Sequence, residues 1–335
     1  MDDSRVTWIS RLLASVLALF VLGLGHGHAQ SGHSDADTSK KRIMENAPNA
    51  DCTRTSVGLT PLSDLALGTY RGYEGGLYPL GSNEPPLDYK WMGRARASRV
   101  QPLNQEGQPD PNGRIVLLSI GMSNTTQEFS TFKSMADADP DKNPQLTIVD
   151  GAQGGQDAET IRNPNAQFWT IVDQRLTAAG VTRNQVQTAW LKEAIAREDR
   201  PFPNDAIGLR DALRDIVGIM QTRYPNLQII YMASRIYAGY ATTNLNPEPY
   251  AYHSGFAVKW LIDENINSDG YRPWLAWGPY LWADGTTPRS DGLTWLCSDF
   301  QNDGTHPSTS GRQKVATMLL NFFKTNESAR PWFLR

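Results

Sequence analysis

Four apolar runs along the chain have the pattern of buried β-strands. Each is rich in β-branched and aliphatic residues and lacks the regular apolar and polar alternation of a half-exposed strand. Nearly continuous apolar runs are typical of parallel strands that are covered on both faces. We therefore expect four buried strands, at residues 114–120, 146–149, 186–191 and 227–233.

Amphipathic helices are predicted between and after these strands. Residues 206–224 carry apolar side chains at helical spacing, and Pro225 ends the pattern. Residues 166–179, 256–266 and 309–324 can be interpreted in the same way. Strands that alternate with helices indicate parallel β-α units. The predicted fold is therefore α/β, a three-layer α/β/α sandwich with a doubly wound, mainly parallel sheet.

The N-terminal residues have the features of an export signal. The apolar run 12–24 follows Arg5 and Arg11, and it is too short for a hydrocarbon core, which needs about 20 residues. We predict a signal peptide over residues 1–29, cut after Ala29, with a retained membrane anchor as the alternative. Residues 30–60 are predicted to be a polar tether. A secreted or periplasmic protein, without stable membrane insertion after signal cleavage, is the expected outcome.

The rest of the chain, residues 61–335, is predicted to form a single domain. Residues 61–113 are rich in Gly, Pro and Asn and should form loops over one edge of it. With 39% hydrophobic residues, 20% charged residues and a net charge of −3, the composition is that of a globular protein and does not suggest a nucleic-acid partner. Neither metal-ligand spacing nor a phosphate-binding loop is present, so we predict no metal and no cofactor. The sequence indicates no oligomeric state.

The chain contains two cysteines, Cys52 and Cys297. An even count in an exported protein favours a disulfide. Such a bridge would join the start of the domain to a segment close to the C-terminal helix. Two unpaired buried thiols are the alternative.

Candidate chemistry lies where the predicted strands end, because ligands of such sheets bind at the carboxyl ends of the strands. Ser123 follows the first strand and should open a helix, where unpaired backbone N–H groups form an anion site. Three of the five histidines fall within residues 1–60, so His253 and His306 remain as candidate bases. His306 follows Asp303 in a glycine-containing turn, in which the carboxylate can orient the imidazole as in a catalytic triad. Simple capping roles for these residues are the alternative.

These segments resemble the SGNH/GDSL hydrolases, in the Gly-x-Ser-Asn variant met among sugar O-acetylesterases. Residues 121–125 are similar to the first block of that family, and Asp303-Gly-Thr-His306 is similar to its last block. The resemblance implies a flavodoxin-like SGNH hydrolase fold, with Ser123 as the nucleophile, His306 as the base and Asp303 as the residue that orients it.

The same resemblance suggests an oxyanion hole. The backbone N–H of Ser123 and that of Gly155, or less favourably Gly154, would be donors. The family's third block normally supplies an Asn or Gln side chain, but this chain has Lys192 there. Lys192 could donate to the oxyanion or pair with Glu193 at the surface, and Asn124 is another amide within reach. The third donor therefore stays open.

The expected function is a secreted serine esterase that hydrolyses acetyl or other short acyl esters on a carbohydrate through an acyl-serine intermediate. The expected partner is a small-molecule or polysaccharide ester. Aromatic residues gather between residues 231 and 295, so Tyr237, Tyr252 and His253 are candidate substrate contacts, with core packing as the alternative. Two other functions stay open, a polysaccharide O-acetyltransferase with the same triad and a noncatalytic carbohydrate-binding protein.

Overall fold

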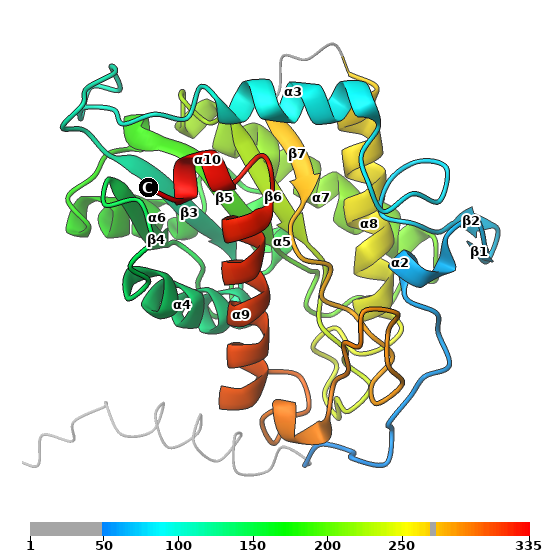
Figure 1. The fold of residues 1–335 in the computed structure, drawn as a ribbon. Coiled ribbons are helices and arrows are strands. Elements are labelled where there is room, and N and C mark those ends of the chain that lie inside the picture. The colour runs from blue at the N-terminus through cyan, green and yellow to red at the C-terminus, as the bar shows by residue number, and fades with distance from the viewer. Residues whose placement is uncertain (1–48, 269–272) are drawn as a thin grey trace, which may run out of the picture. The chain divides into compact units, whose positions relative to one another are not determined.

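The computed structural model describes residues 49–268 and 273–335 (Figure 1). The predicted signal peptide, residues 1–29, and most of the predicted tether lie outside these residues. In the described ranges, no helix combines the length and apolar character needed to cross a bilayer.

A five-stranded parallel sheet forms the centre of the fold, so the predicted α/β architecture is confirmed. Its order is β4-β3-β5-β6-β7, and all neighbouring strands are parallel. Every residue of β3, β5 and β6 is buried, as their continuous apolar runs predicted. Every residue of β7, a strand that was not predicted, is buried as well. The strands are β3 (Ile115–Gly121), β4 (Leu146–Asp150), β5 (Val186–Lys192), β6 (Ile229–Ala233) and β7 (Trp274–Trp277).

Helices cover both faces of this sheet (Figure 1). On one face α4 (Ser123–Asp137) packs against α9 (Thr309–Thr325), with the rings of Phe132 and Phe323 5.2 Å apart. On the other face α7 (Asn204–Arg223) packs against α8 (Tyr250–Ile266). The remaining helical segments after β3 are α5 (Ala158–Ile161), α6 (Gln167–Ala178), α10 (Arg330–Phe333) and the 3-10 helices η1 (Arg183–Gln185) and η2 (Cys297–Asp299).

The strand order places the carboxyl ends of β3 and β5 at the point where the chain changes direction. The chain steps outward from β3 to β4 and then returns past β3 to β5. At such a reversal the connecting segments diverge to opposite faces of the sheet and leave a crevice between them. The segment after β3 begins at Ser123, so the fold brings the predicted nucleophile to this crevice.

Residues 61–113 contain more regular structure than predicted. They form α2 (Leu62–Leu65), the two-stranded sheet of β1 (Thr69–Tyr70) and β2 (Tyr73–Glu74), and α3 (Leu87–Ala97). The buried residues of α3 are Tyr89, Gly93 and Ala97, which recur every four positions without an aliphatic stripe. A Cβ on Gly93 would lie 2.4 Å from the ring of Trp274, so the helix depends on glycine for its close approach to β7.

Residues 49–60, here called the strap, lie against the domain, which corrects the C-terminal end of the polar tether predicted over residues 30–60. The backbone N–H of Asp51 donates to the carbonyl of Tyr240 (2.9 Å). Further along, the carboxylate of Asp284 accepts hydrogen bonds from the hydroxyl of Ser56 (2.5 Å) and the backbone N–H of Val57 (2.7 Å). The polar side chains of the strap suggested solvation, but Ser56 and several backbone groups of the strap bind the domain instead.

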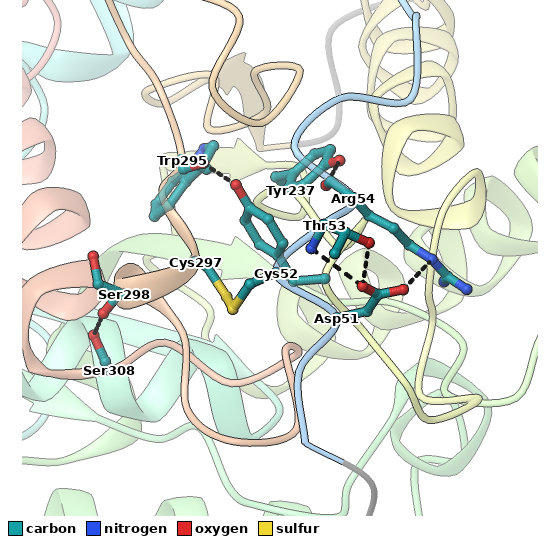
Figure 2. Close-up of a disulfide and its surroundings, with 10 residues drawn as sticks. Asp51, Cys52, Thr53, Arg54, Tyr237, Trp295, Cys297, Ser298 and Ser308 are labelled. Carbon is teal, nitrogen blue, oxygen red and sulfur yellow. Dashed lines mark hydrogen bonds and ion pairs between the residues drawn. A yellow bond between two sulfur atoms is a disulfide. The ribbon is translucent and has the colours of Figure 1, made fainter.

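The predicted disulfide is present and ties the strap to the segment before the C-terminal helix. Cys52 is bonded to Cys297, 245 positions away, and their Cα atoms are 5.4 Å apart. Figure 2 shows this bridge crossing from the strap to η2, beside Tyr237 and Trp295. A cross-link over so long a loop restricts the unfolded chain, and here it also anchors the N-terminal part of the described domain.

Candidate active site

Ser123 is the first residue of α4 and follows β3 after a single residue, Met122. This placement aims the unpaired N–H groups of the helix start at the space around the hydroxyl. The Oγ of Ser123 lies 2.8 Å from Nε2 of His306, although 183 positions separate the two residues. The structure thus brings the predicted nucleophile and base into hydrogen-bond contact.

Asp303 holds the other side of the imidazole. Its Oδ2 lies 2.5 Å from Nδ1 of His306, and its Oδ1 accepts hydrogen bonds from the backbone N–H groups of Thr305 (2.9 Å) and His306 (3.0 Å). Because an ionised carboxylate can only accept, Nδ1 carries the proton and Nε2 is left to accept from Ser123. The three side chains form one hydrogen-bonded line.

The turn that contains Asp303 and His306 depends on Gly304. This residue has a φ of +64°, and a Cβ on it would lie 2.1 Å from the carbonyl oxygen of Tyr240. Glycine is the residue that tolerates both the left-handed backbone and this close approach. The tight turn brings a carboxylate and an imidazole three positions apart into contact.

Hydrogen bonding sets the charge of Asp303. Burial acts to raise the pKa of this carboxyl, but hydrogen bonds from the His306 side chain and from the backbone N–H groups of His306 and Thr305 outweigh burial. The net result is a pKa below the ordinary value of 3.8. Asp303 is therefore an anion that can stabilise a protonated imidazole.

Replacing Asp303 with asparagine is expected to remove a pH-dependent part of the stability. A carboxyl with a lowered folded-state pKa contributes stability that is fully present above the unfolded pKa and is lost as the pH falls through the folded pKa. The difference in Tm between the wild type and Asp303→Asn should therefore be largest above about pH 5 and shrink towards about pH 2. Thermal unfolding of both proteins across this pH range measures the difference in Tm. A difference that does not change with pH contradicts the assignment of Asp303 as a carboxylate with a lowered pKa.

The first turn of α4 is bonded to both neighbouring segments of the site. The side-chain amide of Asn124 donates to the carbonyl of Thr305 (2.9 Å), and the hydroxyl of Thr125 donates to the carbonyl of Lys192 (2.6 Å). Asn124, which was a candidate oxyanion donor, thus uses one of its amide hydrogens to join the nucleophile helix to the histidine turn.

A cavity of about 610 Å³ opens at Ser123 and His306. Gly155 lies in its wall, and a Cβ on Gly154 would lie 3.8 Å from the Cβ of Ser123. Within residues 49–268 and 273–335, neither glycine donates its backbone N–H to an acceptor. Gly154 is therefore beside the nucleophile, and Gly155 lines the same cavity. The cavity is lined by Met122, Ser123, Asn124, Gly155, Asp157, Glu159, Ile195, Ala196, Arg197, Arg235, Leu245, Asn246, Thr305 and His306.

Lys192 lies outside this cavity, which removes it from the candidate oxyanion donors. Its Nζ binds both carboxylate oxygens of Glu128, one of them at 2.6 Å, and the two side chains are 1% and 0% exposed. Burial lowers the pKa of Lys192 to about 8. The predicted alternative, a surface pair with Glu193, is also wrong, because Glu128 on α4 provides the partner in the core.

The three residues predicted to contact substrate lie in the core instead. The hydroxyl of Tyr237 donates to the carbonyl of Arg54 (2.7 Å), and that of Tyr252 donates to the carbonyl of Thr60 (2.8 Å). These bonds hold the strap against the domain. His253 has its Nδ1 2.5 Å from Asp205 and its Nε2 2.9 Å from the hydroxyl of Tyr70. None of the three predicted residues lines the cavity.

One cavity residue that the sequence interpretation missed is Arg235. It stands two positions after β6, its side chain is buried, and it lines the same cavity as Ser123 and His306. The signal for it in the sequence is an arginine directly after the fourth predicted strand, because ligands of such sheets bind at the carboxyl ends of the strands.

The site is thus a hydrogen-bonded line of Ser123, His306 and Asp303 at the carboxyl edge of a parallel sheet. No family model matches the chain, and no curated protein matches it. Among residues 49–268 and 273–335, no group of three or more His, Cys, Asp or Glu side chains is placed to hold a metal ion.

Several solved structures are similar to this chain at low sequence identity. One is a carbohydrate esterase family 3 protein from Talaromyces cellulolyticus, with 14% identity, a TM-score of 0.37 and coverage of 61% of this chain and 94% of that one. Another is the periplasmic domain of a lipopolysaccharide acetyltransferase from Salmonella ser. Paratyphi A, with 14% identity, a TM-score of 0.36 and coverage of 70% and 94%. A GDSL-like lipase from Bacteroides thetaiotaomicron has 10% identity, a TM-score of 0.37 and coverage of 70% and 96%.

Proposed function

We propose that this protein is a serine esterase that removes a short acyl group, such as acetyl, from a carbohydrate. The observation that carries the proposal is the hydrogen-bonded line of Ser123, His306 and Asp303 in the wall of a cavity. A serine whose hydroxyl contacts an oriented imidazole can act as a nucleophile at neutral pH.

The reaction follows from this geometry in two halves. Nε2 of His306 accepts the proton of Ser123 as its Oγ bonds to the ester carbonyl carbon, and the carbonyl oxygen becomes an oxyanion beside the N–H groups of Ser123 and Gly155. His306 then gives the proton to the leaving alcohol oxygen as the ester bond breaks. Water attacks the acyl-serine with His306 again as the base, releasing the carboxylic acid and restoring the serine.

The cavity supports a small ester. Its volume of about 610 Å³ lies within the usual range for small-molecule sites. Met122, Ile195 and Leu245 give part of the wall an apolar character suited to a short acyl group. The carbohydrate part of the proposal rests on the resemblance of the sequence motifs to sugar O-acetylesterases.

Export from the cytosol is part of the same proposal. The Cys52–Cys297 disulfide supports it, because disulfides form and persist mainly in oxidising compartments. The signal peptide over residues 1–29 and the choice between a secreted and a periplasmic location stay predictions.

Rapid mixing with p-nitrophenyl acetate tests the esterase. We expect a burst of p-nitrophenol and an acetyl group on the peptide that contains Ser123, detected by mass spectrometry of the quenched protein. The absence of both acyl-Ser123 and acetate release from an acetylated oligosaccharide contradicts the proposal. With a non-acetylated oligosaccharide added, acetyl transfer that exceeds hydrolysis would identify the acetyltransferase instead.

A further inference from the structure

Arg235 presents a buried positive charge to the catalytic cavity. Its side chain is 1% exposed, and its backbone N–H donates to the hydroxyl of Ser254 on α8 (3.0 Å), which fixes the segment after β6. Charged side chains are seldom buried to this extent unless they are paired.

The guanidinium of Arg235 lacks such a partner. Within residues 49–268 and 273–335, its Nε and Nη2 make no hydrogen bond. Other arginines of this protein use those same two nitrogens to hold the two oxygens of one carboxylate, as Arg183, Arg200 and Arg289 do with Asp173, Glu198 and Asp291. Arg235 therefore differs from them in having no carboxylate of the protein bound to it.

Nearby carboxyl groups are already bonded to other partners. The groups that act on the charge of Arg235 through space are Glu128, Glu193, Glu248 and Asp303. Glu128 holds Lys192 and Asp303 holds His306. Glu248 accepts hydrogen bonds from Trp282 and from two backbone N–H groups. Glu193 accepts one at Oε1 from the backbone N–H of Ala194, and its Oε2 has no partner among the described residues. Burial raises the pKa of Glu193 well above its ordinary value, which favours the neutral acid over an anion beside Arg235.

The acidic and arginine side chains of the cavity wall are two carboxylates, Asp157 and Glu159, and two guanidinium groups, Arg197 and Arg235. The carboxylate oxygens of Asp157 accept hydrogen bonds from the backbone N–H groups of Thr160 and Ala196, and Glu159 pairs with Arg162 outside the lining. Arg197 is exposed and, in the described part of the chain, makes no ion pair. With the Glu159–Arg162 pair counted as neutral, the wall keeps one carboxylate and two guanidinium groups, a single excess positive charge in a protein whose net charge is −3.

A second unpaired atom in the same wall is an acceptor. Asn246 is held by bonds from its backbone N–H to the carbonyl of Ala196 (2.9 Å) and from its amide to the carbonyl of Ile195 (3.1 Å). Its Oδ1 is buried and has no partner among the residues that the structure describes. A ligand that carries both an anionic oxygen and a hydroxyl group would complement Arg235 and Asn246 together.

We propose that Arg235 binds a carboxylate of the substrate, so that the esterase acts on acyl esters of sugar acids. A planar guanidinium matches a carboxylate in charge and geometry, and a charge-assisted bond in a buried site is stronger than one in water. This inference rests on the proposed esterase function and adds the substrate class. Arg235 is then a specificity residue, separate from the Ser-His-Asp line.

A matched pair of substrates tests this proposal. One is fully acetylated methyl glucuronoside with a free carboxylate, and the other is the same acetylated sugar with a carboxamide in place of the carboxylate. For the wild type we expect kcat/KM for the carboxylate to exceed that for the carboxamide by about 10-fold or more. Arg235→Gln should bring the ratio close to one, mainly through KM, and Arg235→Lys should restore part of it. An equal loss of kcat on both substrates would instead indicate an oxyanion donor and overturn the proposal.

Binding to Ser123→Ala protein separates this inference from the esterase itself. Calorimetry should show that Ser123→Ala protein binds the carboxylate sugar more tightly than the carboxamide sugar. The double variant Ser123→Ala, Arg235→Gln should bind the two sugars equally. Both results are expected even if the wild type hydrolyses neither sugar. Arg330→Gln on α10, outside the cavity, is the matched control and should leave the preference intact. Thermal unfolding checks that each variant folds, and equal binding of the two sugars to folded Ser123→Ala protein overturns the proposal.

Discussion

Ser123→Ala is expected to lower kcat for p-nitrophenyl acetate by about 10⁶-fold, because the variant has no oxygen with which to form the acyl intermediate. His306 would remain bonded to Asp303 and the helix start would keep its N–H groups, so the cavity should stay formed. Initial rates under saturating substrate, corrected for spontaneous hydrolysis, measure the loss.

The control for this variant lies on the same helix. Ser130→Ala removes the hydroxyl of an exposed serine on α4 and should leave kcat within about twofold, because surface substitutions away from special features are usually mild. The double variant Ser123→Ala, His306→Gln should be no slower than Ser123→Ala alone, since the two residues act as one unit. If Ser123→Ala kept a tenth of the wild-type rate, the nucleophile assignment would be wrong.

Lys192→Met is expected to destabilise the protein by about 3–5 kcal/mol, because it leaves the carboxylate of Glu128 buried without its counter-charge. Urea unfolding gives the change in free energy from the midpoint and slope. A Lys192 that served the oxyanion would show the opposite pattern, a fall in kcat of about 10²–10³-fold with little change in stability.

Two further variants isolate the buried pair. Lys192→Met combined with Glu128→Leu removes both charges, and much of the lost stability should return. Lys133→Met breaks an ion pair with Asp137 that is exposed on the same helix, and it should cost less than about 1 kcal/mol. A double variant no more stable than Lys192→Met would show that packing, and not the uncompensated charge, causes the loss.

The fold was predictable where burial leaves a long apolar pattern. Strands β3, β4, β5 and β6 follow the predicted runs closely, because both faces of an inner strand need apolar side chains. Two of the elements that escaped prediction did so for related reasons. Strand β7 is short and aromatic, and α3 buries tyrosine, glycine and alanine, so neither shows the usual aliphatic period.

The candidate site was predictable where its residues are close in sequence. Asp303 and His306 lie in one turn, so their contact follows from the local chain. Glu128, the partner of Lys192, lies 64 positions away in the chain, and no sequence pattern indicates which carboxylate Lys192 binds. Tyr237 and Tyr252 illustrate a different limit, because an aromatic side chain with a polar tip suits a binding loop and a core equally well.

Because 183 positions separate Ser123 from His306, the nucleophile is synthesised well before the base. A growing chain can form the first strands and present its nucleophile while the base is still unsynthesised. Ester cleavage can then begin only after the turn that contains Asp303 and His306 has docked beside α4. A precursor shortened before that turn would hold the serine and remain inert toward the esters around it.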